Sequence, residues 1–334
     1  MLSVVKYKSY GRYTAADRKK EARILTYRTE KKKRKPLTKE QKILLLVAAV
    51  FMLYIVAFNY VPIAGWALSL FKYKPAYGLN FARQKFVRFD NFVKLWRERQ
   101  ELFHVLKNTL ILSGLSLLCS PLPMVLAILF SELRRKNFMR VAQTVTTFPN
   151  FISWIIIYGV SYTIFSNSGI WAQMTYFLTG KKQVMGYLSN LDTAYTFHTL
   201  LAEWKSVGWS SIVYCAAIAG IDDSLYEAAK IDGANRLQQI WHITVPGLLE
   251  TFLVLFLLSI SNILSSGFDH YFVFYNPMVA DKLLVLDLWT YRLGISQGDY
   301  SFSIAAGIVR TFVALVLLFS VNAFSRRIRG NSIV

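Results

Sequence analysis

The chain carries few of the residue patterns that catalyse reactions, and they lack the spacing that catalysis needs. The one Gly-Lys pair, Gly180-Lys181, has Thr175 where a phosphate-binding G-x-x-x-x-G-K-[ST] loop has its first glycine. Neither a zinc-binding H-E-x-x-H nor a nucleophile-elbow G-x-S-x-G pattern occurs. The histidines are few and far apart in sequence: His104, His198, His242 and His270. We therefore expect no catalytic site, no metal and no cofactor in this chain.

The longest polar segment among the last hydrophobic stretches has the pattern of two short helices. Ser224 followed by Glu227 is a capping-box signature, which predicts a helix start at Ser224. Gly233 should end that helix, because glycine adopts positive φ without steric cost. Asp232 is placed to cap a second short helix, and Pro246 suits the first turn of a long helix that follows.

This segment, residues 222–247, resembles the EAA loop of ABC-importer permeases, and most closely that of the carbohydrate-uptake, maltose-type subgroup. The resemblance rests on eight positions in the family's order and spacing: Glu227, Ala228, Ala229, Asp232, Gly233, Ala234, Ile243 and Pro246. In that family the loop is a coupling helix that inserts into a groove on a cytosolic ATPase. The resemblance implies that these residues contact such an ATPase, which would bind ATP and Mg. The alternative is that Glu227 only caps a helix at the membrane surface.

The composition predicts a polytopic membrane protein. Hydrophobic residues make up 54% of the 334 residues, and the mean hydropathy is +0.35, too apolar for one ordinary soluble domain. Cys119 and Cys215 both lie in hydrophobic runs, so we expect small buried side chains rather than a disulfide or a metal site.

The basic residues are concentrated at the start of the chain. Residues 1–42 hold 15 of the 39 Lys and Arg residues, including the run 31–35. Such a run can bind nucleic acid, but that function would need a soluble reading domain, which we do not find. Because the run directly precedes an apolar stretch, we expect a retained cytoplasmic tail that binds anionic membrane lipid. The expected domains are this tail, 1–42, and a permease domain, 43–330.

The hydropathy pattern predicts an all-α fold with six transmembrane helices. The charge-free run 43–71 is long enough for the first span. The second should be interrupted by Pro121 and Pro123, which remove backbone donors. We place the other spans within longer apolar runs. The first expected span begins at about residue 43 and ends near Pro62 or Gly65. The other five are about 109–131, 148–165, 207–221, 251–268 and 301–324.

The distribution of positive charge predicts the orientation. With both termini in the cytoplasm of a bacterial cell, the inner segments hold 24 Lys and Arg residues and the outer loops 12. This orientation places the loop 222–247 in the cytoplasm, the compartment of the ATPase that the resemblance implies.

The resemblance extends over about residues 43–330 and implies partners for the chain. Residues 108–110, 148–149 and 204–208 fall where carbohydrate permeases carry similar residues, and the long first loop and basic N-terminus resemble permeases for complex oligo- and polysaccharides. The family implies a second homologous permease, a cytosolic ATPase dimer and an extracytoplasmic solute-binding protein. The sequence does not identify the saccharide.

A sugar path should combine aromatic ring faces with hydroxyl and amide groups in a water-filled cleft near the midplane. The candidates are Trp154, Tyr158, Tyr162, Trp209, Tyr214, Ser259, Asn262 and Ser266. The alternative is that the aromatic residues form interfacial belts and that the small polar residues join helices to one another.

Arg310 lies inside the sixth expected span, where an ionisable side chain normally faces a cavity or a partner charge. One hypothesis is that Arg310 faces the path or the partner permease, where it could meet an acidic sugar such as a uronate. The alternative is that it extends outward to the membrane surface.

Two functions of different classes remain. The first is the transmembrane subunit of an ABC importer for oligo- or polysaccharides. The second is an ion-coupled secondary transporter or channel with an accidental EAA match. Such carriers usually have internal repeats and acidic residues within their spans. The expected spans contain no Asp or Glu at their centres and no convincing repeat, which favours the importer.

Overall fold

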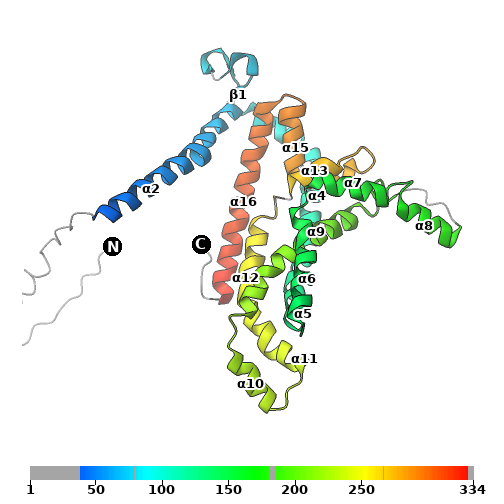
Figure 1. Cartoon of the computed structure of the whole chain (residues 1–334). Helices are drawn as coiled ribbons and strands as arrows, with labels where there is room; N and C mark the ends of the chain where they lie inside the picture. Colours follow the sequence, from blue (N-terminus) through cyan, green and yellow to red (C-terminus); the bar gives the residue numbers. More distant parts are fainter. Residues whose placement is uncertain (1–37, 79, 181–185, 266, 330–334) are drawn as a thin grey trace, which may run out of the picture. The chain divides into compact units, whose positions relative to one another are not determined.

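The computed structural model describes residues 38–78, 80–180, 186–265 and 267–329. The predicted all-α fold is confirmed, since most of these residues lie in helices (Figure 1). The chain divides between Ala64 and Gly65 into two units, which we describe separately. Most of the predicted basic tail, residues 1–37, and the path candidate Ser266 lie outside the described residues.

The described part of the first unit is one helical stretch. Helix α2, Lys39–Ile55, begins at Thr38, whose side chain accepts a hydrogen bond from the Gln41 N–H in a capping box. A π-helical turn, Val56–Tyr60, and a 3₁₀ segment, Val61–Leu70, continue it. Pro62 lacks the N–H that a regular helix would use here, which accounts for the change of helix type. All side chains of α2 are exposed, as suits a helix surrounded by lipid.

The second unit is built around α9, Ala194–Ile218, which packs against α4, α5, α6 and α12. Helices α4, Arg99–Leu118, and α5, Leu122–Ser131, form one apolar stretch that breaks before Pro121, as predicted from the two prolines. The other long helices are α12, Val245–Ser261, and α16, Tyr300–Arg329. Further, shorter helices of this unit are α6 Lys136–Thr147, α7 Trp154–Phe165, α8 Ile170–Thr179, α13 Phe268–Phe274, α14 Ala280–Leu283 and α15 Leu286–Tyr291.

The predicted third span, 148–165, is wrong in its bounds. The helical stretch Lys136–Phe151 ends in a 3₁₀ turn, Phe148–Phe151, and the next stretch, Trp154–Thr179, departs at 103°. Ser153 starts the new helix by accepting a hydrogen bond from the Ile156 N–H at 3.4 Å. The absence of charged residues around this point therefore gives no indication of the bend.

Within the described residues, four helical stretches are long and apolar enough to cross a membrane, or five if the bent pair counts as one span. The four are 39–70, 99–131, 236–261 and 300–320. Helix α9 contains residues 207–218 of the predicted span 207–221, but it also carries Glu203 and Lys205 and is not among the four. The count of six spans stays a prediction.

The polar segment 222–247 has two helical parts, but their ends differ from the prediction. Helix α10, Asp223–Ile231, begins at Asp222 rather than Ser224, and the Asp222 carboxylate accepts a hydrogen bond from the Ser224 N–H at 2.9 Å. Asp232 ends α10 instead of capping the next helix. That helix, α11 Arg236–Gln239, starts at Asn235. The predicted caps were wrong because several residues of capping type lie close together.

The second short helix is not separate from the span that follows. Helix α11, a π-helical turn at Ile240–Thr244 and α12 form one stretch, 236–261. Pro246 lies in the first turn of α12, and its missing N–H again coincides with a π-helical turn just before it. In Figure 1, α10 and α11 lie together at one end of this unit.

The opposite end, which we call the hairpin end, contains the described strands, β1 Phe71–Lys72 and β2 Lys85–Phe86, paired antiparallel. Short 3₁₀ turns, Pro75–Tyr77 and Phe81–Arg83, lie between the strands, and α3, Asp90–Arg97, follows. This end corresponds to the polar loop predicted at 72–106.

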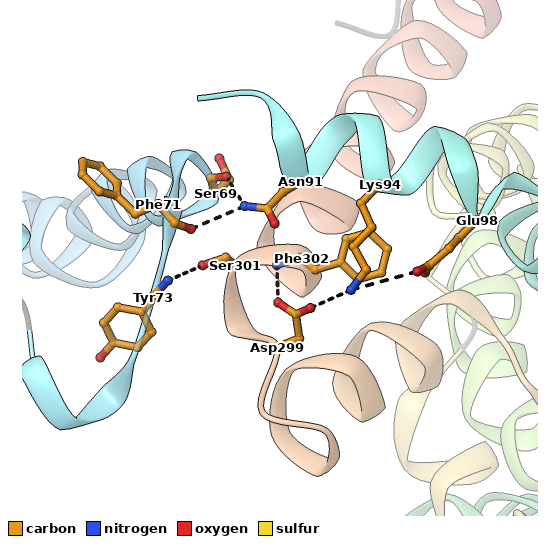
Figure 2. Close-up of polar contacts among 9 residues, drawn as sticks. All are labelled: Ser69, Phe71, Tyr73, Asn91, Lys94, Glu98, Asp299, Ser301 and Phe302. Carbon is orange, nitrogen blue, oxygen red and sulfur yellow. Dashed lines mark hydrogen bonds and ion pairs between the residues drawn. The ribbon is translucent and has the colours of Figure 1, made fainter. Parts of the chain in front are cut away.

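Polar contacts join the hairpin end to Asp299 and the first turn of α16 (Figure 2). The Lys94 ammonium lies 2.8 Å from the Asp299 carboxylate and 4.2 Å from the centre of the Phe302 ring. The Tyr73 N–H donates to the Ser301 hydroxyl at 3.0 Å. Val105, Trp289 and Phe302 form a buried core cluster behind these contacts, so this end of the unit is firmly held.

Candidate functional site

A cavity of about 660 Å³ opens among α4, α7, α9, α12 and α13. Its wall combines aromatic rings, hydroxyl groups and a few charged side chains. Because its long edge follows α9, the position of that helix determines which side chains face the cavity. Gly208 allows α9 to approach α6 closely, since a Cβ at this position would overlap the backbone carbonyl of Thr146.

Several of the path candidates lie on this wall: Trp154, Trp209, Tyr214, Ser259 and Asn262. Tyr214 is 3% exposed and packs with Ala127 and Leu248. Trp209 is half exposed, and its ring contacts that of Phe151 edge-on at 5.6 Å.

The candidates Tyr158 and Tyr162 are not on the wall. The Tyr158 ring packs against that of Phe274 at 5.1 Å, and Tyr162 is 55% exposed. Neither lines the cavity, although they share one face of α7 as their spacing predicted.

Arg310 is part of an ion pair rather than of the cavity wall. Its guanidinium pairs with the Asp287 carboxylate of α15 and donates a hydrogen bond to the Ser265 hydroxyl at 2.8 Å. Ser265 itself lines the cavity. Arg310 therefore contacts the cavity lining through Ser265, and its partner charge is Asp287.

Lys205, which the sequence analysis did not select, joins α9 to the sharp bend. Its ammonium lies 3.0, 2.8 and 2.6 Å from the carbonyl oxygens of Pro149, Asn150 and Ile152. A lysine has three N–H donors, so these three carbonyls use all of them. The side chain thus stabilises the end of the 3₁₀ turn, where carbonyls would otherwise lack partners.

Glu203 also lies on the cavity wall, and its carboxylate accepts a hydrogen bond from the Ser116 hydroxyl of α4 at 2.6 Å. Neither Glu203 nor Lys205 was selected from the sequence as a candidate site residue. Their two-residue spacing inside an apolar helix was the available signal, because charged side chains in such helices normally face a cavity.

Two histidines meet behind the wall, although they are far apart in sequence. His198 Nδ1 and His270 Nε2 lie 3.1 Å apart, so one ring donates and the other accepts. The Trp154 ring stacks on His270 at 3.9 Å. Both histidines are buried, and this aromatic group fixes α7 against α9 and α13. No sequence spacing could have found the pair.

The second candidate surface is the segment 222–247, at the far end of the unit from the hairpin (Figure 1). Gly233 has φ of +78°, the left-handed conformation predicted for it. The Gly233 N–H donates to the Lys230 carbonyl, and the Ala234 N–H donates to the Ala229 carbonyl. These two hydrogen bonds form a Schellman motif at the C-terminus of α10. The Tyr226 hydroxyl lies 2.9 Å from that of Thr244 and holds α10 against the π-helical turn.

Five of the eight EAA-loop positions surround one hollow of about 320 Å³: Ala229, Asp232, Gly233, Ala234 and Ile243. Glu227 and Ala228 are exposed on α10, which has no buried residue, and Pro246 is exposed on α12. Large apolar side chains are also uncovered here, including Ile231 at 87% exposed and Trp241 at 66%. Such a surface on a well-defined fold is typical of an interaction site.

The charge at the start of α10 is set by its cap. The Ser224 backbone N–H, which hydrogen bonds to the Asp222 carboxylate, lowers the pKa of Asp222 below its usual value. Asp222 therefore stays ionised near neutral pH and complements the positive end of the helix dipole.

The chain matches a family model described as "Binding-protein-dependent transport system inner membrane component" over residues 120–330. It is 34% identical to the polygalacturonan/rhamnogalacturonan transport system permease protein YteP of Bacillus subtilis, over 90% of this chain and 93% of that protein. Protein LplB of the same organism is 33% identical over 86% of this chain and 90% of LplB.

Solved structures agree with these matches. A chain of a bacterial ABC transporter that imports the acidic polysaccharide alginate is 33% identical and has a TM-score of 0.77, with 87% of this chain and 97% of that chain covered. A complex of the bacterial alginate transporter with a periplasmic protein that holds an alginate pentasaccharide gives a TM-score of 0.77 at 32% identity, with 88% and 98% covered. The chain belongs to the family of binding-protein-dependent transport system inner membrane components, the permeases of ABC transporters.

Proposed function

We propose that this chain is a permease subunit of an ATP-driven importer for oligosaccharides or polysaccharides. The named transport activities of the relatives support this substrate class, since YteP is named for pectic polysaccharides and the alginate transporter imports an acidic one. The alginate complex also supports an extracytoplasmic solute-binding protein as a partner.

The observation that carries the proposal is the composition of the cavity wall. Trp154 and Trp209 offer aromatic rings for the apolar faces of sugar rings, while Ser259 and Asn262 offer polar groups for sugar hydroxyls. A cavity of about 660 Å³ is within the size range of small-molecule sites. A second homologous permease would close the open side of this cavity and complete the path.

The energy for transport would come from ATP and Mg bound to a cytosolic ATPase dimer. In this proposal the segment 222–247 inserts Glu227 and Ala228 into a groove on that ATPase, and closure of the ATPase pair tilts α10 as a rigid lever. Motion of α10 would reach the cavity wall through α12. The Tyr226–Thr244 contact joins α10 to the helical stretch 236–261, which includes α12. This arrangement requires both termini and the loop to be cytoplasmic, as the charge distribution predicts.

The test is uptake of labelled oligosaccharide into vesicles that contain the complete importer, with ATP enclosed on the ATPase side. We expect uptake that requires ATP and the solute-binding protein, and that persists when ionophores remove ion gradients. Glu227→Arg should abolish uptake, because it reverses a charge at the centre of the exposed α10 surface, while the chain still inserts. Uptake that ionophores abolish and ATP does not support would establish the ion-coupled alternative instead.

A further inference from the structure

The cavity wall presents one acidic side chain whose binding capacity is largely unused. Among the described residues that line the cavity, Glu203 is the acidic one and Lys205 the lysine. Lys205 directs its three donors to the carbonyls of Pro149, Asn150 and Ile152, so it has none left for a ligand. Arg310 lies off the wall and is paired with Asp287.

Glu203 is held in place but not saturated. The Ser116 hydroxyl donates to one carboxylate oxygen at 2.6 Å and fixes the side chain against α4. A carboxylate can accept about four hydrogen bonds, so most of its capacity remains open toward the cavity. Glu203 is half-buried within an apolar helix, where an ionised group is retained only if it meets water, a ligand or a partner.

Three hydroxyl groups that line the same cavity offer it hydrogen-bond acceptors, as the Glu203 carboxylate does. The hydroxyls of Ser113, Thr199 and Ser259 donate to the backbone carbonyls of Ile263, Tyr195 and Leu255 at 2.7, 2.8 and 2.9 Å. Their hydrogens are therefore in use, and what they offer the cavity is oxygen lone pairs. Together with Glu203 these three hydroxyls supply hydrogen-bond acceptors to the cavity wall.

We propose that Glu203 is a specificity-determining residue of this subunit, whose carboxylate binds sugar hydroxyls and repels sugar carboxylates. Hydroxyl groups donate to a carboxylate in short, charge-assisted hydrogen bonds, about twice as strong as bonds between neutral groups. A uronate would bring a second negative charge close to Glu203, on a wall whose described lysine, Lys205, has all three N–H donors engaged by backbone carbonyls. An acidic chain in this path therefore turns its hydroxyl edge toward α9 and its carboxylates toward the opposite side, which another subunit supplies.

This assignment rests on the proposed function, and one substrate pair tests both. A galacturonate trisaccharide and its methyl ester share a skeleton and differ in charge. Uptake of each is measured in vesicles with the complete importer, for the wild type, Glu203→Gln and Glu203→Asp. Glu250→Gln is the matched control, because it removes a carboxylate from an exposed position on α12 outside the cavity wall.

We expect Glu203→Gln to raise the ratio of acid to ester uptake about tenfold, the effect of removing one like-charge contact near a protein surface. Glu203→Asp and Glu250→Gln should leave the ratio within about twofold of the wild type, since the first keeps the charge and the second lies elsewhere. Because each variant is compared with the same solute-binding protein, the ratio reports the permease.

An unchanged ratio in Glu203→Gln, with ATP-dependent uptake intact, overturns the assignment and leaves the proposed function standing. The same holds if Glu250→Gln changes the ratio as much as Glu203→Gln does. If Glu203→Gln assembles poorly, Glu203→Asp is the deciding variant. Because it keeps the negative charge, an increase of about tenfold in its ratio of acid to ester uptake would contradict the role given to the charge. No ATP-dependent uptake of any saccharide by the wild type overturns the proposed function and the assignment with it.

Discussion

Replacing Gly208 by alanine should separate two helices that the cavity depends on. A Cβ on Gly208 would overlap the carbonyl group of Thr146 and the backbone nitrogen of Thr147. These are backbone atoms and cannot rotate away as a side chain would. The added methyl group must therefore push α9 and α6 roughly 1 Å apart to restore van der Waals separation.

The expected cost follows from two opposing terms. Alanine in place of glycine in a helix interior stabilises by about 0.5–1 kcal/mol. Overpacking by one methyl group costs about 1–3 kcal/mol. The net change for Gly208→Ala is thus a loss of about 0–2.5 kcal/mol in the free energy of unfolding, and the backbone overlap places it toward the upper end. The displacement also moves Trp209 and Lys205 on the cavity wall. We therefore expect the uptake rate per folded molecule to fall as well as the free energy of unfolding.

Gly114→Ala is the matched control, because it is the same change in the interior of α4, where nothing lies within 4 Å of the added Cβ. The assay is thermal loss of the folded chain in detergent, followed by size-exclusion chromatography with fluorescence detection. We expect Gly114→Ala to be slightly more stable than the wild type and Gly208→Ala to melt several degrees lower. If Gly208→Ala is as stable as Gly114→Ala and transports normally, the close approach of α9 to α6 is wrong.

Three further sets of variants test the coupling surface and the ion pair. Gly233→Ala should weaken coupling of ATP hydrolysis to uptake, since an L-residue with φ of +78° costs about 1–2 kcal/mol; Gly233→Asn should be milder, and equal coupling ratios for both variants and the wild type would contradict this. The lowered pKa of Asp222 means that its cap stabilises α10 above the unfolded pKa and is lost as pH falls through the lower folded value. The protection factor of the Ser224 amide, its intrinsic exchange rate relative to the observed rate at the same pH, should therefore fall at acid pH in the wild type but not change with pH in Asp222→Asn. Arg310→Gln or Asp287→Asn alone should lower stability by about 1–3 kcal/mol by leaving one charge unpaired. The double variant should melt above both single variants; additive losses would mean that the pair is not formed.

The sequence predicted best those features that depend on local backbone chemistry. Pro121 marks the break between α4 and α5, and Gly233 has the positive φ expected where α10 ends. These positions follow from one residue's own conformational limits. Helix caps were less predictable, because Asp222 and Ser224 can both cap and lie two residues apart.

Features that depend on distant residues could not be predicted. The 103° bend after Phe151 is held by Lys205, which is more than fifty residues away, and the charge-free run around the bend gives no sign of it. The ion pair of Arg310 with Asp287 joins two helices, so a search within one span could not find it. The packing of the Tyr158 ring against Phe274 likewise joins two helices that are distant in sequence. Tyr158 was therefore selected for the path although its ring is engaged in this contact.

The most direct test is whether the exposed surface of α10 binds an ATPase. Ala228→Cys, in a chain whose Cys119 and Cys215 are replaced by serine, provides a single exposed thiol on α10 for crosslinking in native membranes. We expect a crosslink to a cytosolic ATPase subunit, and its loss when Glu227→Arg is added. If the thiol at position 228 crosslinks to no ATPase, and the chain is purified without one whether or not Glu227 is changed, energy does not enter transport through this segment.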